Sequence, residues 1–124
     1  VTAAYLVDDE GNAYVELAQA SGLALVDPTP DSAVRATTFG TGELIRDALE
    51  RGARSVTVFI GGSATTDGGV GMAKALGYTF FDADGSVLPS VAECKRAGLA
   101  WVGERLGEIT RVVPPARPIA ARFT

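Results

Sequence analysis

The stretch SVTVFIGGSATTDGGVGMAKALG, residues 55–77, decides the fold class. It opens with an apolar run, SVTVFI, which predicts a strand buried on both faces, as the strands of parallel sheets are. A loop with four glycines follows the run, and VGMAKALG, residues 70–77, then predicts a short helix. A buried strand, a glycine loop and a helix in this order indicate an α/β fold.

The segments on either side of this stretch extend the same α/β pattern. Apolar residues at helical spacing predict a helix from about Thr41 to Arg51, with Gly52 as its C-terminal stop. Two short apolar runs around DDEGN, residues 8–12, predict an N-terminal hairpin. The pattern of residues 19–26 fits either a short helix or a strand. Residues 27–32 are predicted to form a loop, because two prolines break either element. Residues 78–88 are predicted to form a strand, a turn and a short returning segment.

Composition excludes several classes of function. The chain has 124 residues, about one domain, and a net charge of −4, which argues against nucleic acid or an anionic membrane as a partner. It has no histidine, so histidine-based catalysis and histidine-bound metal are excluded. The single cysteine, Cys94, indicates a reducing compartment. The sequence shows neither a signal peptide nor an apolar stretch long enough to span a membrane.

The last third of the chain differs from the rest. Residues 1–90 carry an acidic excess and residues 91–124 a basic one, and three prolines cluster near the end. We expect residues 91–124 to form a marginal helix from about Val91 to Leu106, followed by a proline-rich extended or disordered end. We expect this tail not to complete the core of residues 1–90, and the apolar surface left exposed to cause self-association.

The glycine loop is the first candidate site, because open α/β sheets bind ligands at the carboxyl ends of their strands. Its glycines let a ligand approach the backbone, its hydroxyls donate hydrogen bonds, and the start of the next helix favours an anion. The pattern matches neither a Walker loop nor a dinucleotide-binding fingerprint. The residues expected to bind phosphate or substrate are Gly61, Gly62, Ser63, Thr65 and Gly68.

Asp67 is the unusual member of this loop, because an acid repels an anionic ligand. It makes chemical sense as a catalytic residue that accepts a proton from a substrate hydroxyl, or as a ligand of Mg²⁺. The alternative is structural: Asp67 is the N-cap of the helix that follows the loop.

Three further positions have both a structural and a functional interpretation. Thr38 and Thr41 lie at the start of the long helix, where they either cap it or form a second anion site. Glu16 lies on the solvated side of a strand, or else presents its carboxylate to a polar ligand. Lys74 is expected to face solvent from the helix after the glycine loop.

The motifs GTGELI, GGSATTDGG and GMAKALG, together with VELAQASGLALV, occur in an order that resembles the glycerate kinase family of the two-domain α/β type. The resemblance covers about residues 1–88. It implies a fold with a parallel or mixed sheet, flanking helices and an N-terminal hairpin. It also implies a cytoplasmic enzyme that phosphorylates D-glycerate with ATP and Mg²⁺.

Two departures from the family pattern shape the functional expectation. Family members are longer than this chain. They begin with a segment that supplies a lysine near the phosphates, and no part of this sequence matches that segment. The resemblance also ends after Leu88. We therefore expect residues 1–90 to be an incomplete portion of the family fold, with weak or absent activity on its own. The alternative is a non-catalytic fragment that keeps the glycine loop for anion binding or for interaction.

Overall fold

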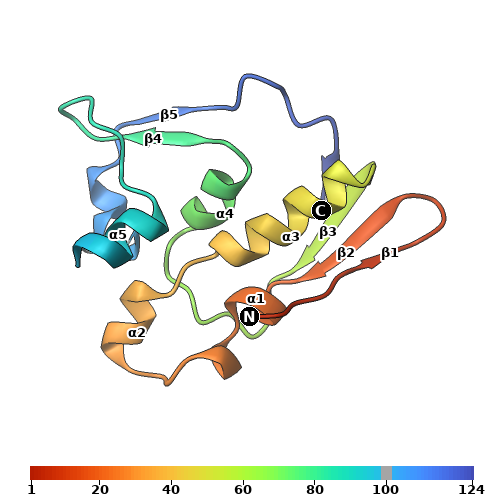
Figure 1. Cartoon of the computed structure of the whole chain (residues 1–124), viewed down its shortest axis with the longest axis horizontal. Helices are drawn as coiled ribbons and strands as arrows, with labels where there is room; N and C mark the ends of the chain where they lie inside the picture. The colour runs from red at the N-terminus through yellow and green to blue at the C-terminus, as the bar shows by residue number, and fades with distance from the viewer. Residues whose placement is uncertain (99–101) are drawn as a thin grey trace.

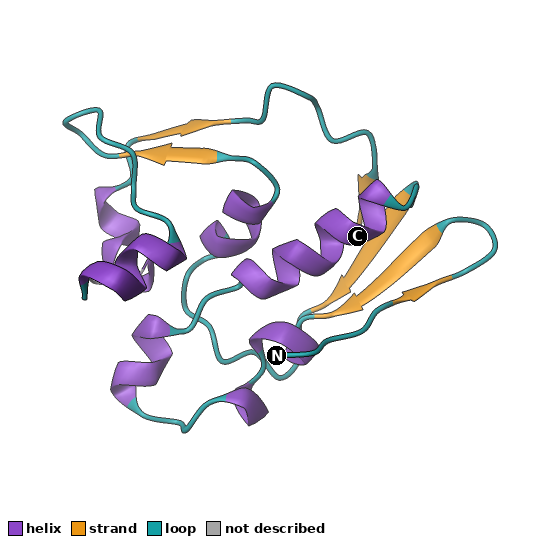
Figure 2. Cartoon of the chain, in the orientation of Figure 1, coloured by secondary structure: helices purple, strands orange, loops and turns teal. Residues whose placement is uncertain are grey.

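The computed structural model describes residues 1–98 and 102–124. Its strands form a four-stranded sheet in the order β1-β2-β3-β6 and a two-stranded sheet of β4 and β5. Helices α3 and α4 lie between the two sheets in Figure 1, and Figure 2 shows the same arrangement by secondary structure. The mixed α/β architecture expected from the sequence is confirmed.

The elements follow one another along the chain with these bounds: β1 (Leu6–Val7), β2 (Asn12–Glu16), α1 (Ala18–Ser21), η1 (Leu23–Leu25), α2 (Pro30–Arg35), α3 (Phe39–Glu50), β3 (Ser55–Phe59), α4 (Val70–Ala75), β4 (Thr79–Phe81), α5 (Val91–Ala97), α6 (Val102–Arg105), η2 (Leu106–Glu108), β5 (Arg111–Val113) and β6 (Arg122–Phe123).

The predicted N-terminal hairpin is present. Strands β1 and β2 pair antiparallel, with Leu6 opposite Tyr14. Gly11 takes a φ of +80° in the turn, a conformation that glycine adopts without steric cost. The Asp8 carboxylate accepts hydrogen bonds from the Asn12 backbone N–H at 2.9 Å and from the Asn12 side chain at 2.9 Å. The turn is therefore closed by its own side chains.

Strand β3 runs parallel to β2 and to β6, but the expectation that it is buried on both faces is wrong. Helix α3 covers one face, where the core residues are at most 1 % exposed: Ala13, Val15, Ile45, Ala48 and Val56. On the other face, Phe59 is 52 % exposed and Leu6 is 61 % exposed. Apolar composition predicts that a strand avoids water, but the neighbouring elements decide how many of its faces are covered.

A second correction concerns the loop expected over residues 27–32, because helix α2 begins there at Pro30. Proline is tolerated in the first helical turn, where its missing N–H has no partner to lose. Thr29 caps the helix: its hydroxyl accepts from the Ser32 N–H at 3.0 Å, and the Ser32 hydroxyl accepts from the Thr29 N–H at 2.9 Å. Pro30 therefore starts a helix rather than breaking one, while Pro28 lies before the N-cap.

Helices α3 and α4 pack closely. A Cβ added to Gly42 would lie 2.6 Å from the Met72 carbonyl oxygen and 2.6 Å from the Ala75 Cβ, so only glycine fits at this crossing. Helix α3 begins two residues before the predicted Thr41, and Gly52 follows its end with a φ of +95°, as expected of a stop signal. This close approach brings the N-terminal ends of the two helices together.

The tail joins both sheets. Strand β5 pairs with β4, and β6 pairs with β3, so the proline-rich end is extended and hydrogen-bonded. Leu106 and Ile109 pack against a second apolar cluster of Val70, Phe80 and Leu88, which differs from the expectation that the tail stays outside the core. The single helix expected from Val91 is instead two short helices, because α5 ends at Gly98 in the left-handed conformation. Part of the predicted helix, residues 99–101, lies outside the described residues.

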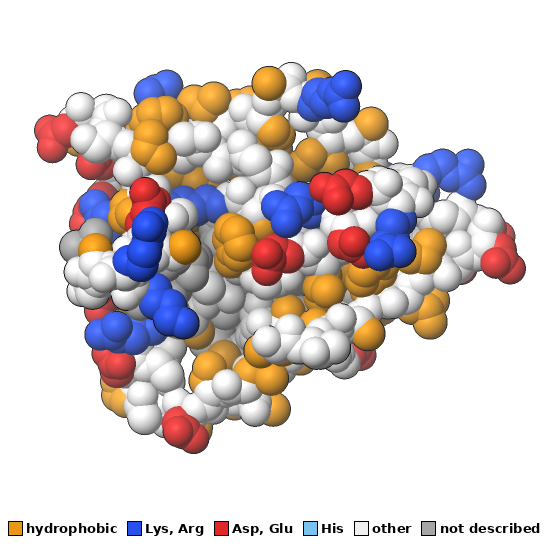
Figure 3. All heavy atoms as spheres, in the orientation of Figure 1, with side chains coloured by type: hydrophobic (Ala, Val, Ile, Leu, Met, Phe, Trp, Pro, Cys, Tyr) orange, Lys and Arg blue, Asp and Glu red, His pale blue; other side chains and the backbone are white. Residues whose placement is uncertain are grey.

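On the face seen in Figure 3, Lys and Arg side chains alternate with Asp and Glu over α3, whereas several Lys and Arg side chains lie together near α5. Over α3 this alternation includes ion pairs four residues apart, such as Asp47 with Arg51 at 2.7 Å. Among the helices of the described residues, none is long and apolar enough to span a bilayer.

Candidate functional site

The glycine loop, residues 60–69, connects the carboxyl end of β3 to α4, as the sequence predicts. It runs alongside the segment that follows α1 (Figure 1). The Gly62 carbonyl accepts from the Leu23 N–H at 2.9 Å, and the Ala64 N–H donates to the Ser21 carbonyl at 3.0 Å. These two bonds attach the loop to the segment after α1, and they leave Gly61, Gly62 and Ser63 exposed to solvent.

The exposed part of the loop presents hydrogen-bond donors to solvent. Within the described residues, the backbone amides of Gly61, Gly62 and Ser63 make no hydrogen bond. A Cβ added to Gly61 would meet nothing within 4 Å, and Gly62 has a φ of +71°. The Ser63 and Thr65 hydroxyls lie 2.8 Å apart on the same loop. Three consecutive amides and two hydroxyls together can bind an anion.

Asp67 lies in a different environment, since its side chain is buried at 1 % exposure and surrounded by donors. Its Oδ2 accepts from the Thr38 N–H at 2.8 Å, the Gly71 N–H at 3.1 Å and the Thr37 hydroxyl at 3.1 Å. Its Oδ1 accepts from the Gly69 N–H at 3.1 Å. The carboxylate therefore joins the first turns of α3 and α4, where both helix dipoles favour a negative charge.

Thr38 completes this junction. Its hydroxyl donates to Asp67 at 2.9 Å and accepts from the Met72 N–H of α4 at 2.9 Å, and the residue is 3 % exposed. The amides at the start of α4, which the sequence suggested for anion binding, are thus bonded to Asp67 and Thr38. A ligand finds donors in the exposed loop instead.

Gly71 is a residue that the sequence reasoning missed. A Cβ at this position would lie 2.6 Å from the Asp67 Oδ2 and 2.7 Å from the Phe39 nitrogen. The glycine therefore lets the α4 backbone approach the carboxylate. The sequence held a signal for this contact, because Gly71 lies inside the predicted helix, two residues after Gly69. Helix propensity disfavours glycine at such a position, but propensity alone does not show which group approaches it.

The structure gives no support for a metal ion held by Asp67. Both of its oxygens already accept hydrogen bonds from the protein. In the two described stretches, no group of three or more His, Cys, Asp or Glu side chains could hold a metal ion. The capping alternative is closer to the observed geometry: Gly69 occupies the N-cap position, and Asp67 accepts from amides at and after it.

The other predicted residues divide between the two environments. Thr41 is fully buried, and its hydroxyl lies 2.8 Å from the Ser21 hydroxyl, where it joins α3 to α1. Glu16 is exposed at the end of β2, in register with Phe59, and its Oε2 accepts from the Gln19 side chain at 3.1 Å. Gly68 is exposed with a φ of +59°. The structure thus places Thr38, Thr41 and Asp67 inside, and the remaining predicted residues at the surface.

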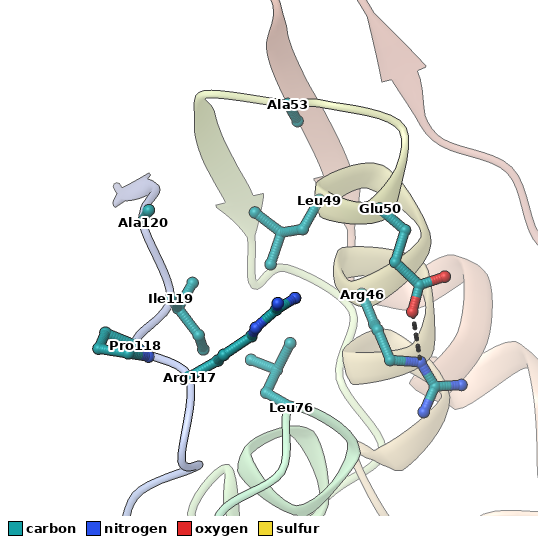
Figure 4. A pocket seen from close by; sticks show the side chains of 9 residues that line it. All are labelled: Arg46, Leu49, Glu50, Ala53, Leu76, Arg117, Pro118, Ile119 and Ala120. Carbon is teal, nitrogen blue, oxygen red and sulfur yellow. Dashed lines mark ion pairs between the residues drawn. The ribbon is translucent and has the colours of Figure 1, made fainter.

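Two hollows lie at opposite ends of α3. One, of about 260 Å³, borders the glycine loop at Thr65 and is also lined by Arg35 and Thr37. The other, of about 390 Å³, lies at the C-terminal end of α3, where Arg117 of the tail points between Leu49 and Leu76 (Figure 4). Of these two, the first shares Thr65 with the predicted site, and another hollow of about 410 Å³ is lined by Glu16 and Phe59.

Lys74 corrects another expectation, because it does not face solvent freely. Its ammonium donates to the carbonyls of Leu88 at 3.0 Å and Pro89 at 2.6 Å. Partial burial lowers the pKa of the Lys74 ammonium below its ordinary value. The side chain therefore ties α4 to the segment before α5.

Comparisons with known proteins agree with this architecture. The sequence model of the glycerate kinase family matches residues 1–113, which extends past the residues that carry the resemblance in sequence. The glycerate 2-kinase of Escherichia coli K12 is 47 % identical over 87 residues, covering 69 % of this chain and 23 % of that protein. The glycerate kinase of Halalkalibacterium halodurans is 38 % identical over 108 residues, covering 84 % and 28 %.

A solved structure supports the same relation. A protein assigned as glycerate kinase 2 from Salmonella typhimurium LT2 superposes with a TM-score of 0.78 at 35 % sequence identity. The superposition covers 99 % of this chain and 31 % of the other. The chain thus spans less than a third of the relatives that it matches.

Proposed function

Because the chain belongs to the glycerate kinase family, we propose that it carries the ligand-binding loop of an ATP-dependent kinase that phosphorylates D-glycerate. The observation that carries the proposal is the run of exposed, unbonded amides at Gly61, Gly62 and Ser63, at the carboxyl end of a parallel strand. Phosphates and carboxylates are the ligands that such donors bind.

The chemistry asked of this chain is positioning and charge stabilisation, because phosphoryl transfer needs little covalent help from the protein. The loop amides and the hydroxyls of Ser63 and Thr65 would donate to anionic oxygens of the nucleotide or the acid. Glu16, exposed at the end of the neighbouring strand, would face the substrate hydroxyl. By the family relation the enzyme would act in the cytoplasm.

ATP is the proposed phosphate donor, and the exposed amides fit its anionic oxygens. Mg²⁺ does not fit Asp67, since that carboxylate is buried and bonded on both oxygens. We propose that Asp67 is a positioning residue that holds Thr38 and Gly71, and through them the base of the loop, in place.

The direct test is an amide-resolved NMR titration of the chain with ATP and with D-glycerate. Residues 61–63 should show the largest shifts, and Gly62→Val should abolish them, because valine does not tolerate a φ of +71°. Gly85→Val is the matched control, since Gly85 has a φ of +79° in the turn after β4, with no atom within 4 Å of an added Cβ. Unchanged loop amides at saturating ligand would refute the proposal.

A coupled assay for ADP formation separates catalysis from binding alone. D-glycerate-dependent release of ADP supports the kinase. Loop shifts without ADP formation would instead support the alternative of a non-catalytic anion-binding module.

A further inference from the structure

On the premise of the proposed function, we infer that Arg35 binds the carboxylate of the acceptor acid in the hollow beside the glycine loop. This hollow of about 260 Å³ is lined by Ala64 and Thr65 of the loop and by Arg35 and Thr37. The reacting end of a small hydroxy acid placed there would lie next to the loop that we propose for the phosphates.

The guanidinium of Arg35 has donors to spare. Its Nε donates to the Asp31 carboxylate at 2.9 Å, in an ion pair whose side chains are 54 % and 71 % exposed. An arginine carries five N–H donors in a planar fork, and this bond uses one of them. A second carboxylate can therefore bind in bidentate geometry without a rearrangement of the first pair.

Two contacts brace the helix that carries Arg35. The Thr66 hydroxyl of the loop donates to the Ala33 carbonyl at 2.9 Å. On the tail side, a Cβ added to Gly103 would lie 2.8 Å from the Val34 carbonyl oxygen. Helix α6 therefore approaches α2 so closely that a residue larger than glycine at position 103 would clash with it. Helix α2 is thus held between the loop and the tail, which fixes the position of Arg35 relative to Thr65.

The lining favours a small acid over a larger ligand. The volume is below that of the pockets which usually enclose drug-sized ligands, about 300–1,000 Å³, and is ample for a three-carbon acid. Leu25, Val26 and Ala36 add apolar surface, against which the carbon atoms of a small acid can pack. Thr65 lines the hollow, so its hydroxyl can hydrogen-bond a hydroxyl of the acid.

The test compares two variants that break the same ion pair but leave opposite charges. Calorimetric titration would measure D-glycerate, glycerol and ATP against wild type, Arg35→Gln and Asp31→Asn. Arg35→Gln should weaken D-glycerate binding at least about tenfold, the loss expected for one charge-assisted hydrogen bond. Asp31→Asn should leave it unchanged or tighten it, since the carboxylate that pairs with Arg35 is then neutral, whereas the charge of Glu104 acts on Arg35 in all three proteins. Glycerol, which has no carboxylate, should bind all three proteins alike.

Each other outcome overturns a different statement. An equal loss of D-glycerate affinity in both variants would show that the ion pair only supports the fold. A selective loss of ATP affinity in Arg35→Gln would make the hollow a nucleotide subsite. Wild-type affinity in Arg35→Gln would refute this inference alone, whereas a wild-type chain that binds no D-glycerate would refute the proposed function as well.

Discussion

Replacement of Asp67 by asparagine keeps the size of the side chain and removes its charge. Oδ2 accepts from the N–H groups of Thr38 and Gly71, and Oδ1 accepts from that of Gly69. The asparagine oxygen can replace only one carboxylate oxygen. If it takes the Oδ2 position, the new NH₂ group faces the Gly69 N–H, and two donors then meet inside the protein.

The expected cost follows from these contacts. One hydrogen bond to a charged acceptor contributes about 1.5–3 kcal/mol, and a buried donor left without a partner costs about 1–3 kcal/mol. The Gly69 amide is only partly buried, so we expect a loss of about 2–4 kcal/mol in the free energy of unfolding. In a domain of this size that corresponds to a fall of roughly 8–16 °C in the melting temperature.

Urea unfolding followed by circular dichroism measures this change. The control is Asp84→Asn, at an exposed turn position, which should change the free energy of unfolding by less than about 0.5 kcal/mol. The reasoning fails if Asp67→Asn unfolds at the wild-type urea concentration. It also fails if Mg²⁺ alone stabilises the wild type but not the variant, because Asp67 would then be a metal ligand rather than a positioning residue.

Two other predictions use the same assay, and a third uses thermal unfolding at a series of pH values. Gly71→Ala should destabilise the chain by about 1–3 kcal/mol, since its Cβ would lie 2.6 Å from Asp67 Oδ2; a wild-type unfolding curve would contradict this. Lys74→Met should cost about 1–3 kcal/mol, because two backbone carbonyls lose their donor, whereas the exposed Lys95→Met should cost little; equal effects would count against it. A hydrogen bond from Tyr5 lowers the pKa of the Asp47 carboxyl in the folded protein. The ionised carboxylate therefore stabilises the fold at pH values above its unfolded pKa, near 4. This stabilisation is lost as the pH falls through the lower pKa of the folded state. The melting temperature of Asp47→Asn should therefore depend less on pH between about 5 and 2 than that of the wild type, and parallel pH profiles would refute the assignment.

Local signals in the sequence were enough to predict the central elements, although they missed helix α2 and the division of the tail helix. An apolar run predicted β3, and helical spacing predicted α3 and α4. Gly11 and Gly52 predicted the turn and the helix end, where the structure has a φ of +80° and +95°. These signals act over a few residues, because backbone conformation and helix termination depend on near neighbours. The exposed glycine loop belongs to the same class, since its glycine content and its position after a strand are properties of its own segment.

The tertiary structure alone decided what each polar residue of the site does. Asp67, Thr38 and Thr41 belong to sequence motifs beside the exposed loop residues, yet they are buried while Ser63 is exposed. The difference arises because Asp67 meets Thr38 from 29 positions away, and each then satisfies a polar group that would otherwise be buried without a partner. In the same way, Lys74 is held by carbonyls 14 and 15 residues further along. Burial and hydrogen-bond partners depend on which distant segments the fold brings together, and composition and spacing do not contain that information.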